Sequence, residues 1–195
     1  MVPVRRFVPR SNGEREKTMN SFTNAMRRAV SGVSIVTTDG NHGRYGLTVS
    51  SMTSVSAEPP MLLICINRHS VAHDAIVANR RFAINVLAAH HQDVAAAFAG
   101  STTLGPAYDF ESGVWSVTAS GLPRLVDPAA IFECELESSM QAGTHSIFLG
   151  RVAHAQSRDI APLAYSNREY GVPMPLETAN GTYVGTKNVL EAFRL

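Results

Sequence analysis

The sequence predicts a mainly β protein with helices, of the α+β class, built as an antiparallel barrel into which helices are inserted. Six or more short runs typical of strands are joined mostly by short links. Three helical segments interrupt these runs without alternating regularly, which argues against a doubly wound parallel sheet. No G-x-G-x-x-G fingerprint follows a strand, since Gly40, Gly43 and Gly46 have the wrong spacing. A chain of 195 residues with 45% hydrophobic residues can bury a core without staples.

The first elements are an arm, a helix and a hairpin. Residues 1–19 are predicted to be a mobile basic arm with little apolar pattern. A helix is expected over residues 21–31, capped by Ser21 and ended by Gly32. Its inward face is expected to comprise Phe22, Met26, Ala29 and Val30. Residues 33–38 form a predicted strand, and the Asp-Gly-Asn turn at residues 39–41 predicts a hairpin.

The most unusual stretch is residues 44–60, RYGLTVSSMTSVSAEPP. Short hydroxyl side chains dominate residues 48–56, with small apolar residues between them, and two prolines end the segment. Small side chains leave backbone groups within reach of a flat ligand, and hydroxyls can bond a phosphate or a ring oxygen. The pattern therefore indicates a cradle for a bound cofactor, and the alternative is a hydroxyl-rich edge strand that faces water.

A second candidate binding feature follows directly. Residues 61–66 are a continuous apolar run and are predicted to be a central strand covered on both faces. Residues 67–70 then turn the chain into a short helix over residues 71–79, with Ser70 at the N-cap position. A helix start favours an anion, and Arg68 adds positive charge, so this turn is a candidate phosphate seat. Simple capping of a surface helix is the alternative.

The rest of the chain continues the same alternation of strands and inserted helices. Strands are expected at residues 82–87, from Trp115, at 129–138, at 145–156 and at 161–166, with the third and fourth forming a hairpin. A helix is expected over residues 89–99, with Val94 and Phe98 inward and Gly100 as its stop, before a loop at residues 101–113. Residues 172–195 are expected to be an extension, with a helix-like end at 187–193, that wraps the body loosely or contacts a partner subunit.

Several classes of function are disfavoured. A net charge of +1 does not argue for a nucleic-acid surface, and neither cysteine lies in a Cys-x-x-Cys motif, so both are expected to be reduced and buried. His69 and His73 stand four apart without a third ligand, so no metal site is expected. Without a signal-peptide core or a membrane-spanning run, a soluble cytoplasmic protein is expected. His145 opens a strand, where a lone histidine is more often structural than functional.

Five blocks in order carry a resemblance to a known family: GLTVSSMTSVSAEPPMLLICINRHS, RFAINVL, DVAAAFAG, GTHSIFLGRV and PLAYSNREYG. Together they resemble the short-chain flavin reductases, the reductase partners of two-component flavin monooxygenases. The resemblance covers residues 22–171 and gives a predicted domain over residues 20–171. It implies a split antiparallel β-barrel of the FMN-binding type, assembled as a homodimer with the flavin near the interface.

The resemblance also implies a reaction and a set of site residues. Hydride would pass from NADH or NADPH to FMN or FAD, and the reduced flavin would go to an oxygenase component. His145 would sit by the nicotinamide as the catalytic residue. The residues implied in cofactor binding are Gly46, Leu47, Thr48, Val49, Ser50, Ser51, Ser54, Val55, Asn67, Arg68, His69, Ser70, Arg81, Tyr165, Arg168 and Tyr170. The alternatives are a flavin-binding electron carrier or sensor without diffusible-flavin turnover, and an oxidase of the related pyridoxamine-phosphate-oxidase barrel.

Overall fold

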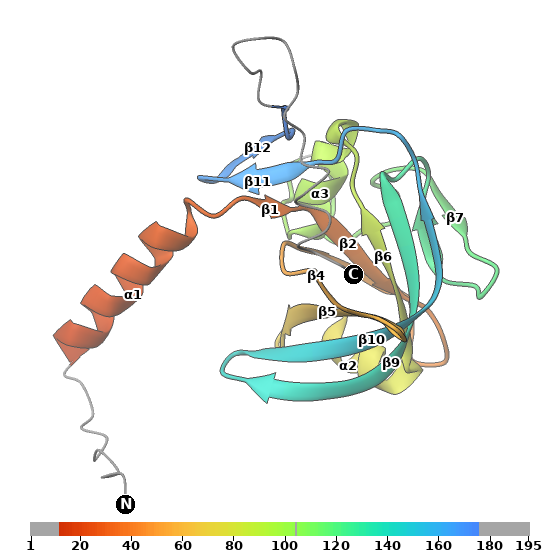
Figure 1. Ribbon diagram of the computed structural model, residues 1–195, viewed down its shortest axis with the longest axis horizontal. Helices are drawn as coiled ribbons and strands as arrows, with labels where there is room; N and C mark the ends of the chain where they lie inside the picture. The colour runs from red at the N-terminus through yellow and green to blue at the C-terminus, as the bar shows by residue number, and fades with distance from the viewer. Residues whose placement is uncertain (1–11, 104, 176–195) are drawn as a thin grey trace, which may run out of the picture.

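A computed structural model describes residues 12–103 and 105–175 and shows a mainly β molecule (Figure 1). The helices are α1 (Asn12–Met26), α2 (His73–Asn79) and α3 (Gln92–Phe98), with a short 3-10 turn, η1 (Ala89–His91), before α3. The strands are β1 (Ser31–Gly32), β2 (Ser34–Thr38), β3 (Tyr45–Val49), β4 (Thr53–Ala57), β5 (Pro60–Asn67), β6 (Arg81–Val86), β7 (Trp115–Val117), β8 (Pro123–Leu125), β9 (Ala130–Ala142), β10 (His145–Ser157), β11 (Ala164–Ser166) and β12 (Glu169–Gly171). The expected α+β class is confirmed.

One antiparallel sheet of seven strands forms the body, in the order β3-β2-β6-β9-β10-β5-β4. The end strands β3 and β4 do not pair with each other, so the sheet is not closed into the barrel that the sequence predicts. The reason lies in the hydroxyl-rich stretch, which is two strands rather than one. The chain leaves β3 after Val49, and β4 begins at Thr53 and pairs with the start of β5.

Several local predictions are confirmed. The hairpin of β2 and β3 turns at residues 39–44, and the long hairpin of β9 and β10 turns at Gly143 and Thr144.

The expectation that the strand at residues 61–66 is buried on both faces is wrong, because burial alternates along β5. Leu62, Ile64 and Ile66 point into the core, and the residues between them are half-buried.

The core has two main parts, one on each side of β2 and β3. One part contains Ile64 of β5, Phe82 of β6 and Phe148 of β10, three strands of the seven-stranded sheet. The other gathers around Phe98 of α3, as predicted, and includes contacts with the ring of Trp115. Consecutive residues of β3 face these two parts alternately, which is the two-residue period of a strand. The pocket described below opens along β3, so both parts of the core help to hold it.

Helix α1 differs most from expectation. It spans Asn12–Met26 instead of residues 21–31, and the hydroxyl of Ser21 donates to the carbonyl of Lys17 within the helix instead of capping it. Every described side chain of α1 is exposed, and Figure 1 shows the helix projecting from the body. The supposed inward face is therefore open, since Phe22 is 65% exposed and Met26 is 52% exposed.

The two ends of the chain complete the comparison. After α1, β1 joins β11 and β12 in a separate small sheet. Helix over residues 12–19 replaces part of the predicted arm, and residues 1–11 lie outside the described part. The helix-like end at residues 187–193 also lies outside it. The division into arm, domain and extension stays a prediction.

Candidate active site

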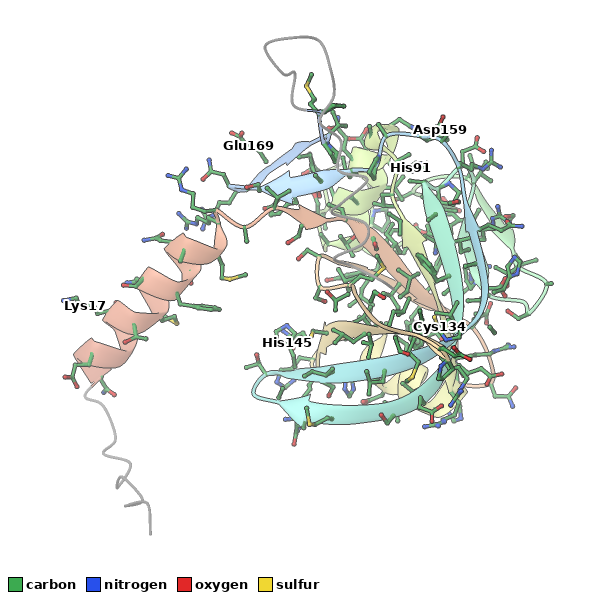
Figure 2. All side chains as sticks on the ribbon, viewed as in Figure 1. Lys17, His91, Cys134, His145, Asp159 and Glu169 are labelled. Carbon is green, nitrogen blue, oxygen red and sulfur yellow. The ribbon has the colours of Figure 1, made fainter. Side chains whose placement is uncertain are left out.

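A pocket of about 250 Å³ opens between the end of β3, the end of β5 and the start of β10. It is lined by Leu47, Thr48, Val49, Ser50, Ser51, Cys65, Asn67 and His145. All of these except Cys65 were predicted site residues. Strand register explains the meeting of distant segments, because His145 lies directly opposite Asn67 where β10 pairs with β5. Figure 2 labels His145 at the end of the β9–β10 hairpin.

Free strand edges give the pocket its binding potential. Strand β3 ends the sheet, whereas β5 is covered by β4 from Pro60 to Leu63 and then by the Ser51 hydroxyl at Cys65. An edge strand presents unpaired N–H and C=O groups. The pocket therefore offers backbone donors and acceptors beside small side chains, and a flat polar ring fits that surface. Ligand pockets usually hold about 300–1,000 Å³, so this hollow has room for only part of a large ligand.

The hydroxyl groups play a different part from the one predicted. Ser51 Oγ donates to the carbonyl of Cys65 and accepts from its N–H, both at 2.9 Å. Thr48 Oγ1 donates to the carbonyl of Ala95 in α3 at 2.8 Å. These two hydroxyls tie the strand to its neighbours, so their contribution to the pocket is backbone and shape. Ser50 is exposed and keeps its hydroxyl available to a ligand.

The turn after β5 is held tightly. Asn67 Oδ1 accepts from the N–H of His69 at 3.0 Å, and the N–H of Arg68 donates to the carbonyl of Thr144 at 3.0 Å. The guanidinium of Arg68 lies against the amide of Gln141 and, with the amide oxygen turned toward it, donates from Nη2 at 2.7 Å. The β9–β10 turn is thereby attached to the floor of the pocket.

Ser70 does not cap the following helix, which corrects the prediction. Helix α2 begins at His73 after Ala72, and no side chain bonds its first N–H groups. Ser70 Oγ is buried without a hydrogen-bond partner among the described residues. With seven residues, α2 has only a small dipole, so the phosphate seat at its start loses its main argument.

Four predicted cofactor-binding residues lie away from the pocket. A Cβ on Gly46 would meet the ring of Phe98 at 2.7 Å, so this glycine gives α3 room to pack. Ser54 and Val55 belong to β4, beyond the break in the hydroxyl-rich stretch. Arg81 donates to the backbone carbonyls of two loops at the other end of β6. Arg81 therefore does not reach the pocket, although it follows Asn67 closely in the sequence.

The predicted nicotinamide side forms its own small group. Tyr165 and Tyr170 lie opposite each other on β11 and β12, with ring centroids 5.3 Å apart. Burial, followed by the nearby Tyr165, raises the pKa of Tyr170, so its phenol stays neutral at physiological pH. Arg168 occupies the turn between the strands at a φ of 68°. In the described residues, no hydrogen bond or ring contact joins these three side chains to the pocket.

His145 presents its imidazole ring at the pocket with one nitrogen open to solvent or a ligand. It is exposed, and Thr144 Oγ1 lies 2.9 Å from its Nδ1. That contact orients the ring and leaves Nε2 without a partner among the described residues. Cys65, which the sequence interpretation treated as a buried thiol, is half-exposed and lines the pocket. Nothing in its apolar run distinguished it from Cys134, which is buried as predicted.

The family model for the flavin reductase like domain matches residues 26–173. The chain belongs to this family. An NADH-dependent FMN reductase (RutF) of Variovorax paradoxus is 42% identical over 76% of this chain and 82% of its own length. The Agrobacterium fabrum protein of the same name is 38% identical, over 80% of this chain and 90% of its own length.

Solved structures agree with this assignment. BorF, the flavin reductase component of a bacterial two-component tryptophan halogenase, aligns with a TM-score of 0.71 and 31% identity, over 79% of this chain and 97% of BorF. The NADH:FAD oxidoreductase SgcE6 of Streptomyces globisporus aligns with a TM-score of 0.72 and 28% identity, over 92% of this chain and 98% of its own. The expected enzyme class, an NAD(P)H-dependent flavin reductase, is confirmed.

Two further observations concern the described part of the chain. None of its helices has both the length and the apolar character needed to cross a bilayer. Residues 12–103 and 105–175 also contain no group of three or more His, Cys, Asp or Glu side chains placed to hold a metal ion.

Proposed function

We propose that this flavin reductase uses NADH to reduce FMN in the pocket between β3, β5 and β10. The observation that carries the proposal is the meeting of the free edge of β3 with Asn67 and His145 in one open hollow. The named activity of the relatives in Variovorax and Agrobacterium supports FMN and NADH as the pair. FAD and NADPH are the alternatives to be measured against them.

Residues 47–51, Asn67 and His145 would hold the flavin, which would supply the redox chemistry as the acceptor of a hydride from reduced nicotinamide. The chain's own residues would bind the two rings and orient them toward each other. Backbone N–H groups along residues 47–51 stabilise negative charge as it develops on the ring edge. The free hydroxyl of Ser50 and the amide nitrogen of Asn67 add polar contacts. Holding both rings together at one hollow removes much of the entropic barrier to transfer.

His145 stands where a second ring would enter. Thr144 fixes the imidazole, so Nε2 presents a polar atom in a constant direction at the rim of the pocket. We assign it the orientation of the nicotinamide carboxamide. Tyr165, Arg168 and Tyr170 would complete this side only if ligand binding or a second subunit brings them to the rim.

The reduced flavin is proposed to leave and reach an oxygenase component. A hollow of about 250 Å³ holds only part of the nucleotide, which favours exchange over permanent retention. Among the structural neighbours, BorF is named as the flavin reductase component of a two-component tryptophan halogenase, and the Pseudomonas putida protein as a styrene monooxygenase flavin reductase. A cytoplasmic location stays a prediction.

The test is NADH oxidation followed with increasing free FMN. Saturable turnover, with flavin that passes through a dialysis membrane in reduced form under anaerobic conditions, supports the proposal. A permanently yellow protein whose NADH oxidation ignores added flavin would indicate the electron-carrier alternative. Absence of NADH and NADPH oxidation with both flavins would refute the reductase.

A homodimer is proposed as the working form. The support is the open apolar side of α1, where Met19, Phe22 and Met26 are all more than half exposed. An isolated helix of this length is marginal in water, so a covering surface would stabilise it. Sedimentation should show a dimer that Phe22→Asp converts to monomer. A monomeric wild-type chain at working concentration would contradict the proposal.

A further inference from the structure

A chain of three hydrogen-bonded polar side chains, two of them largely buried, lies beside the pocket and has no part in the chemistry above. His73 Nε2 lies 2.9 Å from Ser146 Oγ, and His73 Nδ1 lies 2.7 Å from Asp74 Oδ1. The His73 side chain is 13% exposed and Ser146 is 7% exposed, whereas the Asp74 side chain is 98% exposed. The sequence interpretation considered His73 only as a partner of His69 in a zinc site, which the described residues do not form.

The neighbours of His73 define its hydrogen-bonding state. A carboxylate only accepts, so the Asp74 contact calls for a proton on Nδ1. In this tautomer Nε2 carries a lone pair and can accept a hydrogen bond from the Ser146 hydroxyl. The ring also stands edge-on to Phe148, with centroids 5.3 Å apart and an interplanar angle of 68°. Three contacts therefore hold this imidazole in one orientation.

Acid, imidazole and hydroxyl in this order also occur in serine hydrolases, but the surroundings differ. A nucleophilic serine must be reachable by its substrate. Ser146 lies in the middle of the sheet, where its backbone faces Ile66 of β5 on one side and Gln141 of β9 on the other. Its side chain is almost fully buried and does not line the pocket. The arrangement is suited to holding elements together.

Its location shows which elements are held. Ser146 directly follows His145, and His73 is the first residue of α2, which comes after the turn that starts at Asn67. Outside the β5–β10 ladder, the turn has three backbone–backbone bonds among the described residues: Arg68 to Thr144, Ser70 to Asn67, and a longer bond of 3.3 Å from the N–H of His73 to Ser70. The His73–Ser146 bond is the side-chain tie that fastens the far end of this turn to β10.

We propose that His73 is a positioning residue that, through Ser146, holds the turn after Asn67 against the start of β10 and so keeps the side chains of Asn67 and His145 in one arrangement at the pocket. The inference rests on the proposed function of that pocket. Without the tie, the turn is still joined to the β9–β10 hairpin by the Arg68 contacts with Thr144 and Gln141, but it moves more freely and the Asn67 side chain is held less firmly opposite His145. Asp74 contributes by fixing the tautomer.

Four variants test the proposal. His73→Phe keeps an aromatic ring against Phe148 and removes both hydrogen bonds, and Ser146→Ala removes the partner hydroxyl alone. His73→Gln keeps an amide at the reach of Nε2 and should restore the bond. The fourth is the double variant of His73→Phe with Ser146→Ala. His154→Phe is the matched control, because His154 is an exposed histidine farther along β10.

Loss of the tie should raise the FMN dissociation constant and the KM for FMN about fivefold to tenfold, with kcat changed less than about twofold. The double variant should be no worse than the worse single variant, since each single variant already breaks the same His73–Ser146 bond. Amide exchange over residues 67–73 and 143–146 should speed up in both single variants, and His73→Gln should recover most of the loss. His154→Phe should match wild type in every measurement.

Some outcomes would overturn the proposal. Unchanged exchange over residues 67–73 in Ser146→Ala would do so, as would additive effects in the double variant. Equal loss in His73→Gln and His73→Phe, or labelling of Ser146 by a fluorophosphonate probe, would also refute it. If His73→Phe does not fold, Ser146→Ala decides alone. Exchange and direct FMN titration are independent of turnover, so wild type that fails to oxidise NADH would refute only the proposed function.

Discussion

Removing the hydroxyl of Ser51 gives the sharpest test of how the pocket is built. The Ser51 hydroxyl takes the place of two backbone hydrogen bonds of the sheet, because it both donates to the carbonyl and accepts from the N–H of Cys65. Ser51→Ala deletes both bonds without adding bulk. The end of β3 then loses its fastening to β5 at the point where the pocket opens.

The magnitude follows from the two bonds. Each is worth about 0.5–1.5 kcal/mol net, and a backbone N–H left without a partner adds to the loss. Cys65 is half-exposed, so water can reach the freed groups, and we expect a total cost of about 2 kcal/mol. For a chain of this size that corresponds to a drop in Tm of about 4–8 °C.

The control is the neighbouring serine. Ser50 is exposed and its hydroxyl has no partner among the described residues, so Ser50→Ala should change stability by less than about 0.5 kcal/mol. Calorimetry gives Tm, and fluorescence titration gives the FMN dissociation constant. Ser51→Ala should lower both stability and FMN affinity, whereas Ser50→Ala should affect affinity alone. Equal Tm values for the two variants would refute the reasoning that Ser51 fastens the strands.

Three further predictions concern other residues. His145→Ala should raise the KM for NADH or slow hydride transfer while the FMN dissociation constant stays the same, and unchanged stopped-flow reduction would remove His145 from the reaction. Arg81→Ala should lower Tm through its lost backbone bonds and leave FMN affinity unchanged; weaker binding would return Arg81 to the site. Burial raises the pKa of Cys134 to about 12, so its thiol stays protonated at pH 8, and a thiol reagent should modify Cys65 alone in the native protein. Bound FMN should slow that modification, and reaction of both cysteines at equal rates would contradict the burial of Cys134.

The sequence was sufficient to locate the candidate site but not to describe its contacts. The hydroxyl-rich stretch and the turn that starts at Asn67 stood out from the apolar runs around them, whereas His145 was assigned only through the family resemblance. The hydroxyls were predicted to contact a ligand, whereas those of Thr48 and Ser51 bond to backbone groups. Serine and threonine oxygens bond equally well to a ligand or to nearby backbone, and composition does not distinguish the two. The break between β3 and β4 has the same origin, because Ser51 bonds β5 by its side chain where a ladder would otherwise continue.

Helix α1 shows a second limit of local pattern. Phe22 and Met26 do share one face, as the spacing indicates, yet that face meets no cover in the described part of the chain. Periodicity establishes that a face is apolar and says nothing about which surface buries it. The proposed second subunit is one answer, and the sedimentation test of Phe22→Asp addresses it.

Register between distant strands accounts for the remaining differences. His145 meets Asn67 because β10 pairs with β5 in one register, and a shift by one residue would turn every side chain of β10 to the opposite face. The buried bond joins Ser146 of β10 to His73, the first residue of the helix that follows β5. Any alternative register would bury the Ser146 hydroxyl without its partner or expose it, at a cost of about 1–3 kcal/mol. We propose that the His73–Ser146 bond positions residues of the pocket. The same bond therefore also favours the β5–β10 register in which the pocket forms.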